Sequence, residues 1–169
     1  MMYGAVKACI DSLKRGGKIL IAGNGGSAAQ AQHMAAELMG RFAFDRPGLP
    51  AMSLTTDTSV LTAIGNDYGF EHIFSRQVQA HGKRGDVFIG FSTSGKSPNI
   101  LRAFEEARAC GMVCIGFTGN GDNPMSNCCD FIIEVPSSET PRIQEGHLVL
   151  SHRMCELIEE TLFAPSAVS

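Results

Sequence analysis

Short apolar runs alternate along the chain with longer segments in which apolar residues recur every three or four positions. The short runs have the length of strands that are buried on both faces, and the periodic segments are typical of amphipathic helices. The pattern predicts five strands, at residues 18–23, 51–54, 86–91, 113–118 and 131–135. It predicts helices at residues 27–40, 57–66, 70–81, 98–110 and about 142–162.

This alternation predicts an α/β fold, a three-layer sandwich in which helices flank a five-stranded parallel sheet, doubly wound as in flavodoxin. No internal repeat, low-complexity tract or linker divides the 169 residues, so we expect one domain over residues 1–169. Sheets of this kind bind ligands at the carboxyl ends of their strands. The loops that follow the strands are therefore the first place to look for chemistry.

The loop after the third predicted strand is rich in hydroxyl groups. Ser92, Thr93, Ser94 and Ser97 follow that strand, and Pro98 is suited to the first position of the next helix. Hydroxyls and free backbone N–H groups at the positive end of a helix suit a phosphate ester, and the alternative is an ordinary turn with capping residues. The GxxxxGK[ST] spacing is missing, so we expect a monophosphorylated small molecule rather than a hydrolysed nucleotide.

A glycine loop follows the first predicted strand. Asn24, Gly25, Gly26 and Ser27 allow close approach of the backbone to a ligand and offer a cap for the next helix. Their spacing does not match the GxGxxG fingerprint of dinucleotide-binding folds. The loop therefore fits the second half of a sugar-phosphate site better than a nucleotide site.

The helix that follows this loop carries His33, Glu37 and Arg41 at intervals of four, which places them on one face. A solvated polar stripe would explain that spacing. Most other faces of the helix are small or apolar, however, and a buried His–Glu pair needs a partner, which could be a metal ion or a substrate.

The last predicted helix supplies further ligands. Gln144 and His152 are in phase, and with His33 and Glu37 they offer two imidazole nitrogens and two oxygen ligands, adequate for tetrahedral zinc. His147 is out of phase with them, so we expect a hydrogen-bonded core or surface histidine.

Polar residues lie at both ends of the helix predicted at residues 57–66. Asp57 is expected to cap the helix that begins there. Asn66 and Asp67 form either a turn or a set of contacts to sugar hydroxyls.

Composition narrows the choice of partners. The net charge is −3 and no Lys/Arg run is present, which argues against nucleic acid. No apolar stretch approaches the roughly 20 residues that span a bilayer. The six cysteines form no CxxC pair. We therefore expect reduced thiols in a cytoplasmic protein that uses neither a membrane nor nucleic acid.

Several of these segments together resemble the sugar isomerase (SIS) domain of bacterial phosphoheptose isomerases. The resemblance runs from about residue 6 to residue 163 and rests on residues 23–37, 54–57, 65–70, 92–97 and 142–147. It implies an aldose–ketose isomerase that converts sedoheptulose 7-phosphate to D-glycero-D-manno-heptose 7-phosphate through an enediol. That reaction is the first step toward the activated heptose of surface polysaccharides such as lipopolysaccharide.

The resemblance also implies residue roles and an assembly. The phosphate is expected on Ser92, Thr93, Ser94 and Ser97. The sugar is expected beside Asn24, Gly25, Gly26, Ser27, Glu37, Asn66, Asp67 and Gln144. One zinc ion per subunit is expected on His33, Glu37, Gln144 and His152, with Glu37 and His152 as base and acid. A homo-oligomer, a tetramer with shared active sites, is implied, although the N-terminal helix is shorter than in relatives.

Two alternatives remain open. A non-catalytic SIS module, like the relative that binds the bacterial replication initiator protein, would keep the sheet but has no need of the His/Glu/Gln/His set. An isomerase or sensor could instead act on another sugar phosphate, such as a hexose or pentose 5-phosphate. Zinc content separates the module from an enzyme, and a panel of substrates separates the two enzymes.

Overall fold

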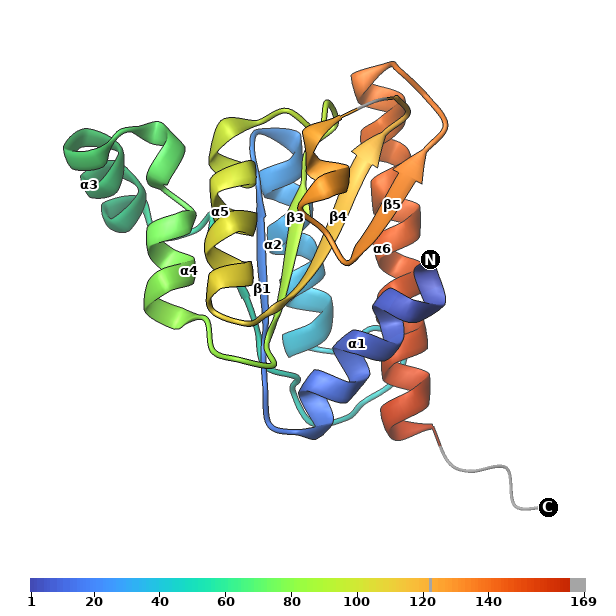
Figure 1. The fold of residues 1–169 in the computed structure, drawn as a ribbon. Coiled ribbons are helices and arrows are strands. Elements are labelled where there is room, and N and C mark those ends of the chain that lie inside the picture. The colour runs from blue at the N-terminus through green and yellow to red at the C-terminus, as the bar shows by residue number, and fades with distance from the viewer. Residues whose placement is uncertain (122, 165–169) are drawn as a thin grey trace.

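A computed structural model of the protein describes residues 1–121 and 123–164, so the last five residues of the expected domain lie outside the described part. The predicted five-stranded parallel sheet is confirmed, with the strand order β2-β1-β3-β4-β5. Figure 1 shows β1, β3, β4 and β5 in this order. The strands are β1 (Ile19–Gly23), β2 (Ala51–Ser53), β3 (Val87–Phe91), β4 (Val113–Gly119) and β5 (Phe131–Val135). Every strand end lies within one residue of its predicted position, because strands covered on both faces have almost continuous apolar sequences.

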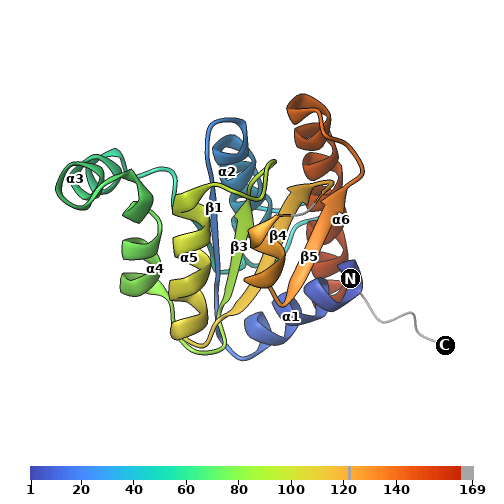
Figure 2. The ribbon, with the colours of Figure 1, turned by 45° about the horizontal axis from the view of Figure 1, so that its top comes forward.

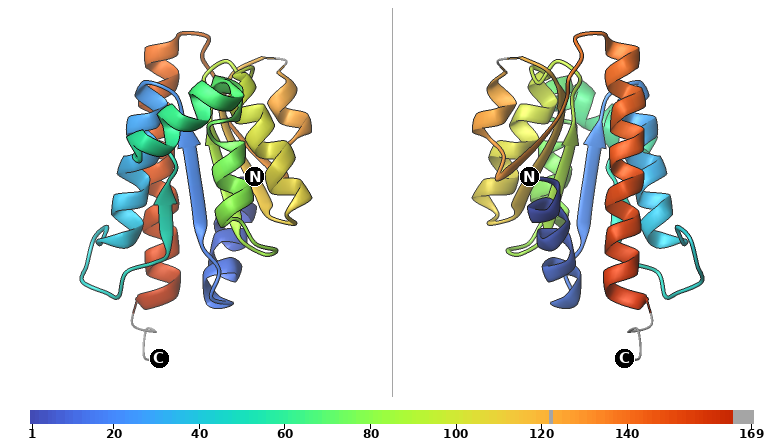
Figure 3. Two further views of the ribbon diagram at one scale, coloured as in Figure 1. Left: turned by 90° about the vertical axis from the view of Figure 1, so that its left-hand side faces the viewer. Right: turned by 90° about the vertical axis from the view of Figure 1, so that its right-hand side faces the viewer.

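Helices cover both faces of the sheet. They are α1 (Met2–Lys14), α2 (Gly26–Met39), α3 (Thr58–Tyr68), α4 (Ser75–His81), α5 (Pro98–Ala109) and α6 (Thr140–Phe163), with 3₁₀ turns η1 (Phe70–His72) and η2 (Pro124–Asn127). Buried residues of α1, α2 and α6 share one apolar cluster with the sheet, and those of α4 and α5 share a second. Figures 2 and 3 show α2 and α6 side by side on one side of the sheet, with α4 and α5 on the other.

The strand order places the loops after β1 and β3 next to each other. From β1 the chain moves outward through α2 to the edge strand β2, and then returns to add β3 on the opposite side of β1. This reversal opens a crevice at the carboxyl ends of the two central strands, which is where doubly wound sheets bind ligands.

Three local predictions were wrong. The helix expected at residues 70–81 is divided into η1 and α4. A continuous α-helix would put Phe70 on the same face as Ile73 and Phe74, whereas Phe70 is 66% exposed and the other two are buried. The 3₁₀ turn η1 directs Phe70 away from the face that buries Ile73 and Phe74. Asn66 and Asp67 lie in the last turn of α3, so the expectation of a turn between elements was wrong, while their contacts to sugar hydroxyls stay a prediction.

The third correction concerns Arg41. Helix α2 ends at Met39, because Gly40 leaves the helical region with ψ at −102°. Arg41 therefore lies beyond the helix and does not share a helical face with His33 and Glu37.

Among the described residues, no helix is both long enough and apolar enough to cross a membrane.

Candidate functional site

A polar cleft opens where β1 and β3 end. Gly23 of β1 and Phe91 of β3 are register partners, so the glycine loop and the hydroxyl loop begin side by side. The cleft has a volume of about 270 Å³ and is lined by Asn24, Gly25, Gly26, Ser27, Phe91, Ser92, Thr93, Ser97, Thr140 and Gln144. Two loops that are far apart in the sequence thus form one site, as the topology requires.

The hydroxyl loop is arranged around one side-chain pair. The Oγ atoms of Ser92 and Ser97 lie 2.9 Å apart. Ser97 is the N-cap residue of α5, yet its side chain makes no cap hydrogen bond, so an anion can take that position at the start of the helix. Ser94 instead accepts a hydrogen bond from the Lys96 backbone N–H (3.2 Å) and lines a neighbouring hollow beside the cleft.

Gln144 closes the opposite side of the cleft. A Cβ on Gly26 would lie 2.5 Å from Gln144 Nε2, so a larger residue at position 26 would displace this amide from the first turn of α2. The Gln30 side-chain amide donates to the backbone carbonyl of Gln144 and links α2 to α6 near their amino ends. Gly26 thus has a packing role with Gln144, and the ligand-binding role of its loop stays a prediction.

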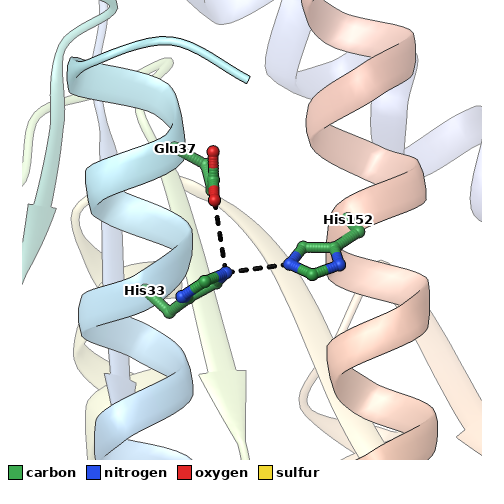
Figure 4. Close-up of side chains that lie close together, drawn as sticks. All are labelled: His33, Glu37 and His152. Atoms are coloured by element: carbon green, nitrogen blue, oxygen red, sulfur yellow. Dashed lines mark hydrogen bonds and ion pairs between the residues drawn. The ribbon is translucent and has the colours of Figure 1, made fainter. Parts of the chain in front are cut away.

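Farther along the same two helices lies a cluster of His33, Glu37 and His152, whose side chains point into the gap between α2 and α6 (Figure 4). His33 Nε2 lies 2.8 Å from His152 Nε2 and 3.3 Å from Glu37 Oε1. The side chains of His33 and Glu37 are 46% and 23% exposed, so the cluster can be reached from solvent.

This cluster fits a metal ion. Its three ligand atoms lie within 4.8 Å of one another. Two imidazole nitrogens and one carboxylate oxygen are also the donor set that zinc favours in open, three-residue protein sites. Gln144 precedes His152 by eight residues, which is about 12 Å along a helix. The structure therefore places Gln144 in the cleft, and its role as a metal ligand stays a prediction.

The remaining predicted residues have varied positions. Asn66 and Asp67 are exposed on α3, where the Asn66 amide donates to Asp67 Oδ1 (2.8 Å), and neither borders the cleft. Asp57 caps α3 as expected, with its carboxylate accepting from the Val60 N–H. His147 is a core histidine, as expected. It is fully buried, its Nε2 is 3.1 Å from the Thr118 carbonyl oxygen, and burial lowers its pKa.

One supporting network escaped the sequence analysis. The Arg46 and Glu159 side chains form an ion pair (2.9 Å) and are 2% and 1% exposed. Arg46 also donates to the carbonyls of Glu37 and Leu38, while Glu159 accepts the backbone N–H of Phe42. The pair therefore joins the carboxyl end of α2 to α6 directly beyond the cluster. The two residues are 113 positions apart, and charged residues ordinarily lie at the surface, so the sequence carries no signal for the pair.

Comparisons with known proteins extend these observations. A family model described as "SIS domain" matches residues 2–119. The phosphoheptose isomerase of Burkholderia pseudomallei (strain 1710b) is 68% identical over 156 residues, which are 92% of this chain and 79% of that protein. The phosphoheptose isomerase of Aneurinibacillus thermoaerophilus is 58% identical over 165 residues, 98% of this chain and 83% of that protein.

Solved structures agree with the sequence comparisons. A phosphoheptose isomerase from Neisseria gonorrhoeae is 46% identical, with a TM-score of 0.89, and the match covers 94% of this chain and 85% of that one. A phosphoheptose isomerase from Francisella tularensis is 41% identical, with a TM-score of 0.91 and the same coverage.

Proposed function

The chain belongs to the SIS domain family, and we propose that it is an aldose–ketose isomerase that converts sedoheptulose 7-phosphate to D-glycero-D-manno-heptose 7-phosphate. One observation carries the proposal. The hydroxyl-lined cleft and the His33/Glu37/His152 cluster lie along the same two helices, about two turns apart. A heptulose 7-phosphate likewise carries its phosphate at one end and its reacting carbons at the other.

The cleft supplies the binding groups. We propose that Ser92, Thr93 and Ser97 of the cleft hold the phosphate together with Ser94 of the neighbouring hollow, helped by the positive end of the α5 dipole. The glycine loop from Asn24 to Ser27 and the Gln144 amide then face the sugar hydroxyls. The loops contribute backbone and side-chain hydrogen bonds that orient the carbon chain of the sugar toward the cluster.

The cluster supplies the proton transfers. Isomerisation moves a proton between C1 and C2 through an enediol, and protons on the two oxygens move as well. Glu37 is the proposed base for the carbon-bound proton, and His152 is the proposed acid that exchanges protons with the oxygens. Glu37 also counts among the substrate contacts for this reason.

We propose that the cluster holds one zinc ion per subunit, bound by His33, Glu37 and His152, with Gln144 as the fourth predicted ligand. A bound zinc ion supplies Lewis-acid polarisation of a carbonyl oxygen and stabilises developing negative charge. The chain's own part is to bring two imidazoles and one carboxylate to the same point from two packed helices.

We propose further that the protein works as a homo-oligomer, a tetramer with shared active sites. Helix α3 buries none of its residues, and Tyr68 and Phe70 at and just after its carboxyl end are 56% and 66% exposed. Apolar surface of this kind favours contact with another chain. A neighbouring subunit would then receive Asn66 and Asp67 from α3 at its sugar site. Light scattering after gel filtration measures the assembly, and a monomer at micromolar concentration would contradict it.

The product is the first intermediate toward an activated heptose. We propose a cytoplasmic enzyme, because all six cysteines are free thiols, as is usual in a reducing compartment.

The direct test is turnover of sedoheptulose 7-phosphate by the purified, zinc-supplied protein, with the aldose product followed by NMR. We expect formation of D-glycero-D-manno-heptose 7-phosphate and much slower turnover of hexose and pentose phosphates in parallel samples. A folded oligomer that turns over another sugar phosphate faster would reassign the substrate. An oligomer that binds zinc and isomerises none of them would contradict the enzyme and favour a binding module.

A further inference from the structure

Two asparagines join the loops of the cleft. Asn24 follows β1, and Asn99 is the second residue of α5, 75 positions later. The Asn24 Nδ2 donates to Asn99 Oδ1, and the Asn99 Nδ2 donates to Asn24 Oδ1, both at 2.8 Å. The two side-chain amides therefore form a reciprocal pair, in which each donates one hydrogen bond and accepts one.

The two members of this pair differ in their surroundings. Asn99 is 2% exposed and does not border the cleft, whereas Asn24 is partly exposed and does. Each amide uses one donor and one acceptor in the pair. Asn24 thus keeps a second N–H and a second lone pair for a ligand, while its orientation is fixed by a residue beneath it.

We infer that Asn99 is a positioning residue of the site, which holds Asn24 and the glycine loop at a fixed spacing from the hydroxyl loop. The inference rests on the proposed function, because it assumes that Asn24 faces the sugar. Ser97 and Asn99 both lie at the start of α5, so the phosphate loop and the Asn24 anchor belong to one rigid element. A sugar held at its phosphate then meets a glycine loop whose position is already set, which is the condition for efficient proton transfer at its far end.

The test compares Asn99→Ala and Asn99→Asp with the wild type. Asn99→Ala removes both hydrogen bonds, and we expect kcat/KM for sedoheptulose 7-phosphate to fall about tenfold, mostly in kcat. Asn99→Asp keeps the acceptor but sets a carboxylate oxygen against Asn24 Oδ1, so we expect a loss at least as large. Dissociation constants for inorganic phosphate, which we propose binds at the hydroxyl loop, should stay within about twofold. Asn127→Asp, at an exposed asparagine of η2, is the matched control and should behave as the wild type.

A double-variant cycle identifies the route of the effect. If Asn99 acts through Asn24, then Asn99→Ala added to Asn24→Ala causes little further loss, and the two effects are strongly non-additive. Additive losses, or unchanged kcat/KM in both Asn99 variants, would overturn the inference. So would a loss of phosphate affinity in parallel with activity, because that indicates collapse of the start of α5.

The same variants separate this inference from the proposed activity. If the wild type binds sedoheptulose 7-phosphate without isomerising it, the proposed activity is wrong. The positioning role of Asn99 is then judged on binding of that sugar phosphate. We expect weaker sugar-phosphate binding with unchanged phosphate binding in Asn99→Ala. Equal binding of the sugar phosphate by wild type and variant would overturn the positioning role of Asn99.

Discussion

His33 and His152 meet nitrogen to nitrogen across the gap between α2 and α6, with their Nε2 atoms 2.8 Å apart. A hydrogen bond at this distance uses one shared proton, so one ring donates and the other accepts. Two rings that aim a nitrogen at the same point, beside a carboxylate, offer the donor atoms of a metal site.

Zinc binding tests that relationship directly. We expect the purified wild type to retain about one zinc ion per chain after dialysis against a weak chelator. His152→Ala removes one of the three donors and should lower zinc affinity at least tenfold, as judged by competition with a chromogenic chelator. His81→Ala, at an exposed histidine of α4, is the control and should bind as the wild type. Equal zinc affinity in both variants would place the metal elsewhere.

Glu37→Gln tests the proposed base. The amide retains an oxygen but cannot take the carbon-bound proton, so we expect kcat to fall by about 10² to 10⁴. Zinc content is measured in the same preparation, since a variant that keeps its zinc and loses turnover isolates proton transfer from metal binding. Glu105→Gln, at a carboxylate that is 64% exposed, should retain full activity. Near-normal turnover by Glu37→Gln would assign the base to another group.

The buried pair of Arg46 and Glu159 should stabilise the fold strongly. Glu159→Gln leaves the Arg46 guanidinium buried without its counter-charge, and we expect the free energy of unfolding to fall by about 3 kcal/mol. Glu156→Gln, in the exposed pair with Arg153 on the same helix, should cost less than about 1 kcal/mol. Urea unfolding followed by circular dichroism measures both. Similar losses in the two variants would show that burial of the pair contributes little.

His147 should make stability depend on pH. Burial holds its pKa below the ordinary value, with its ring among Phe91, Phe117 and the Thr118 carbonyl. Below about pH 6.5 the unfolded chain binds a proton at this residue that the folded chain does not, so stability falls as pH falls. The slope from this one group is at most about 1.4 kcal/mol per pH unit.

His147→Gln should reduce that slope, measured as the free energy of unfolding between pH 7 and the onset of acid denaturation. His81→Gln, at the exposed histidine of α4, should leave the slope as it is in the wild type. An unchanged slope in His147→Gln would mean that the buried ring does not contribute to acid sensitivity.

The sequence predicted the features that are set locally. A strand covered on both faces is a continuous apolar run, as β1 and β3 are, and residues four apart on a helix share a face, as His33 and Glu37 do. The topology brings the two predicted loops together, because they follow two neighbouring parallel strands, β1 and β3.

The features that the sequence did not predict depend on pairs that are distant along the chain. Asn99 is an uncharged residue at the start of a helix, where asparagine ordinarily serves as a capping residue, and its partner is 75 positions away. Periodicity reports which side of an element is buried, but it cannot identify the polar partner that a buried amide or guanidinium finds on another element.

Helices α2 and α6 are tied on both sides of the His33–His152 contact, by the Gln30 amide toward their amino ends and by the pair of Arg46 and Glu159 toward their carboxyl ends. The two ties hold the helices at a fixed separation, so binding of an ion requires only small rotations of the side chains. Zinc forms bonds of about 2.0–2.2 Å to nitrogen and oxygen, whereas calcium needs about 2.3–2.6 Å and more ligands. Because the two helices are anchored, we expect the site to accept a larger ion, with its longer bonds and additional ligands, less readily than zinc.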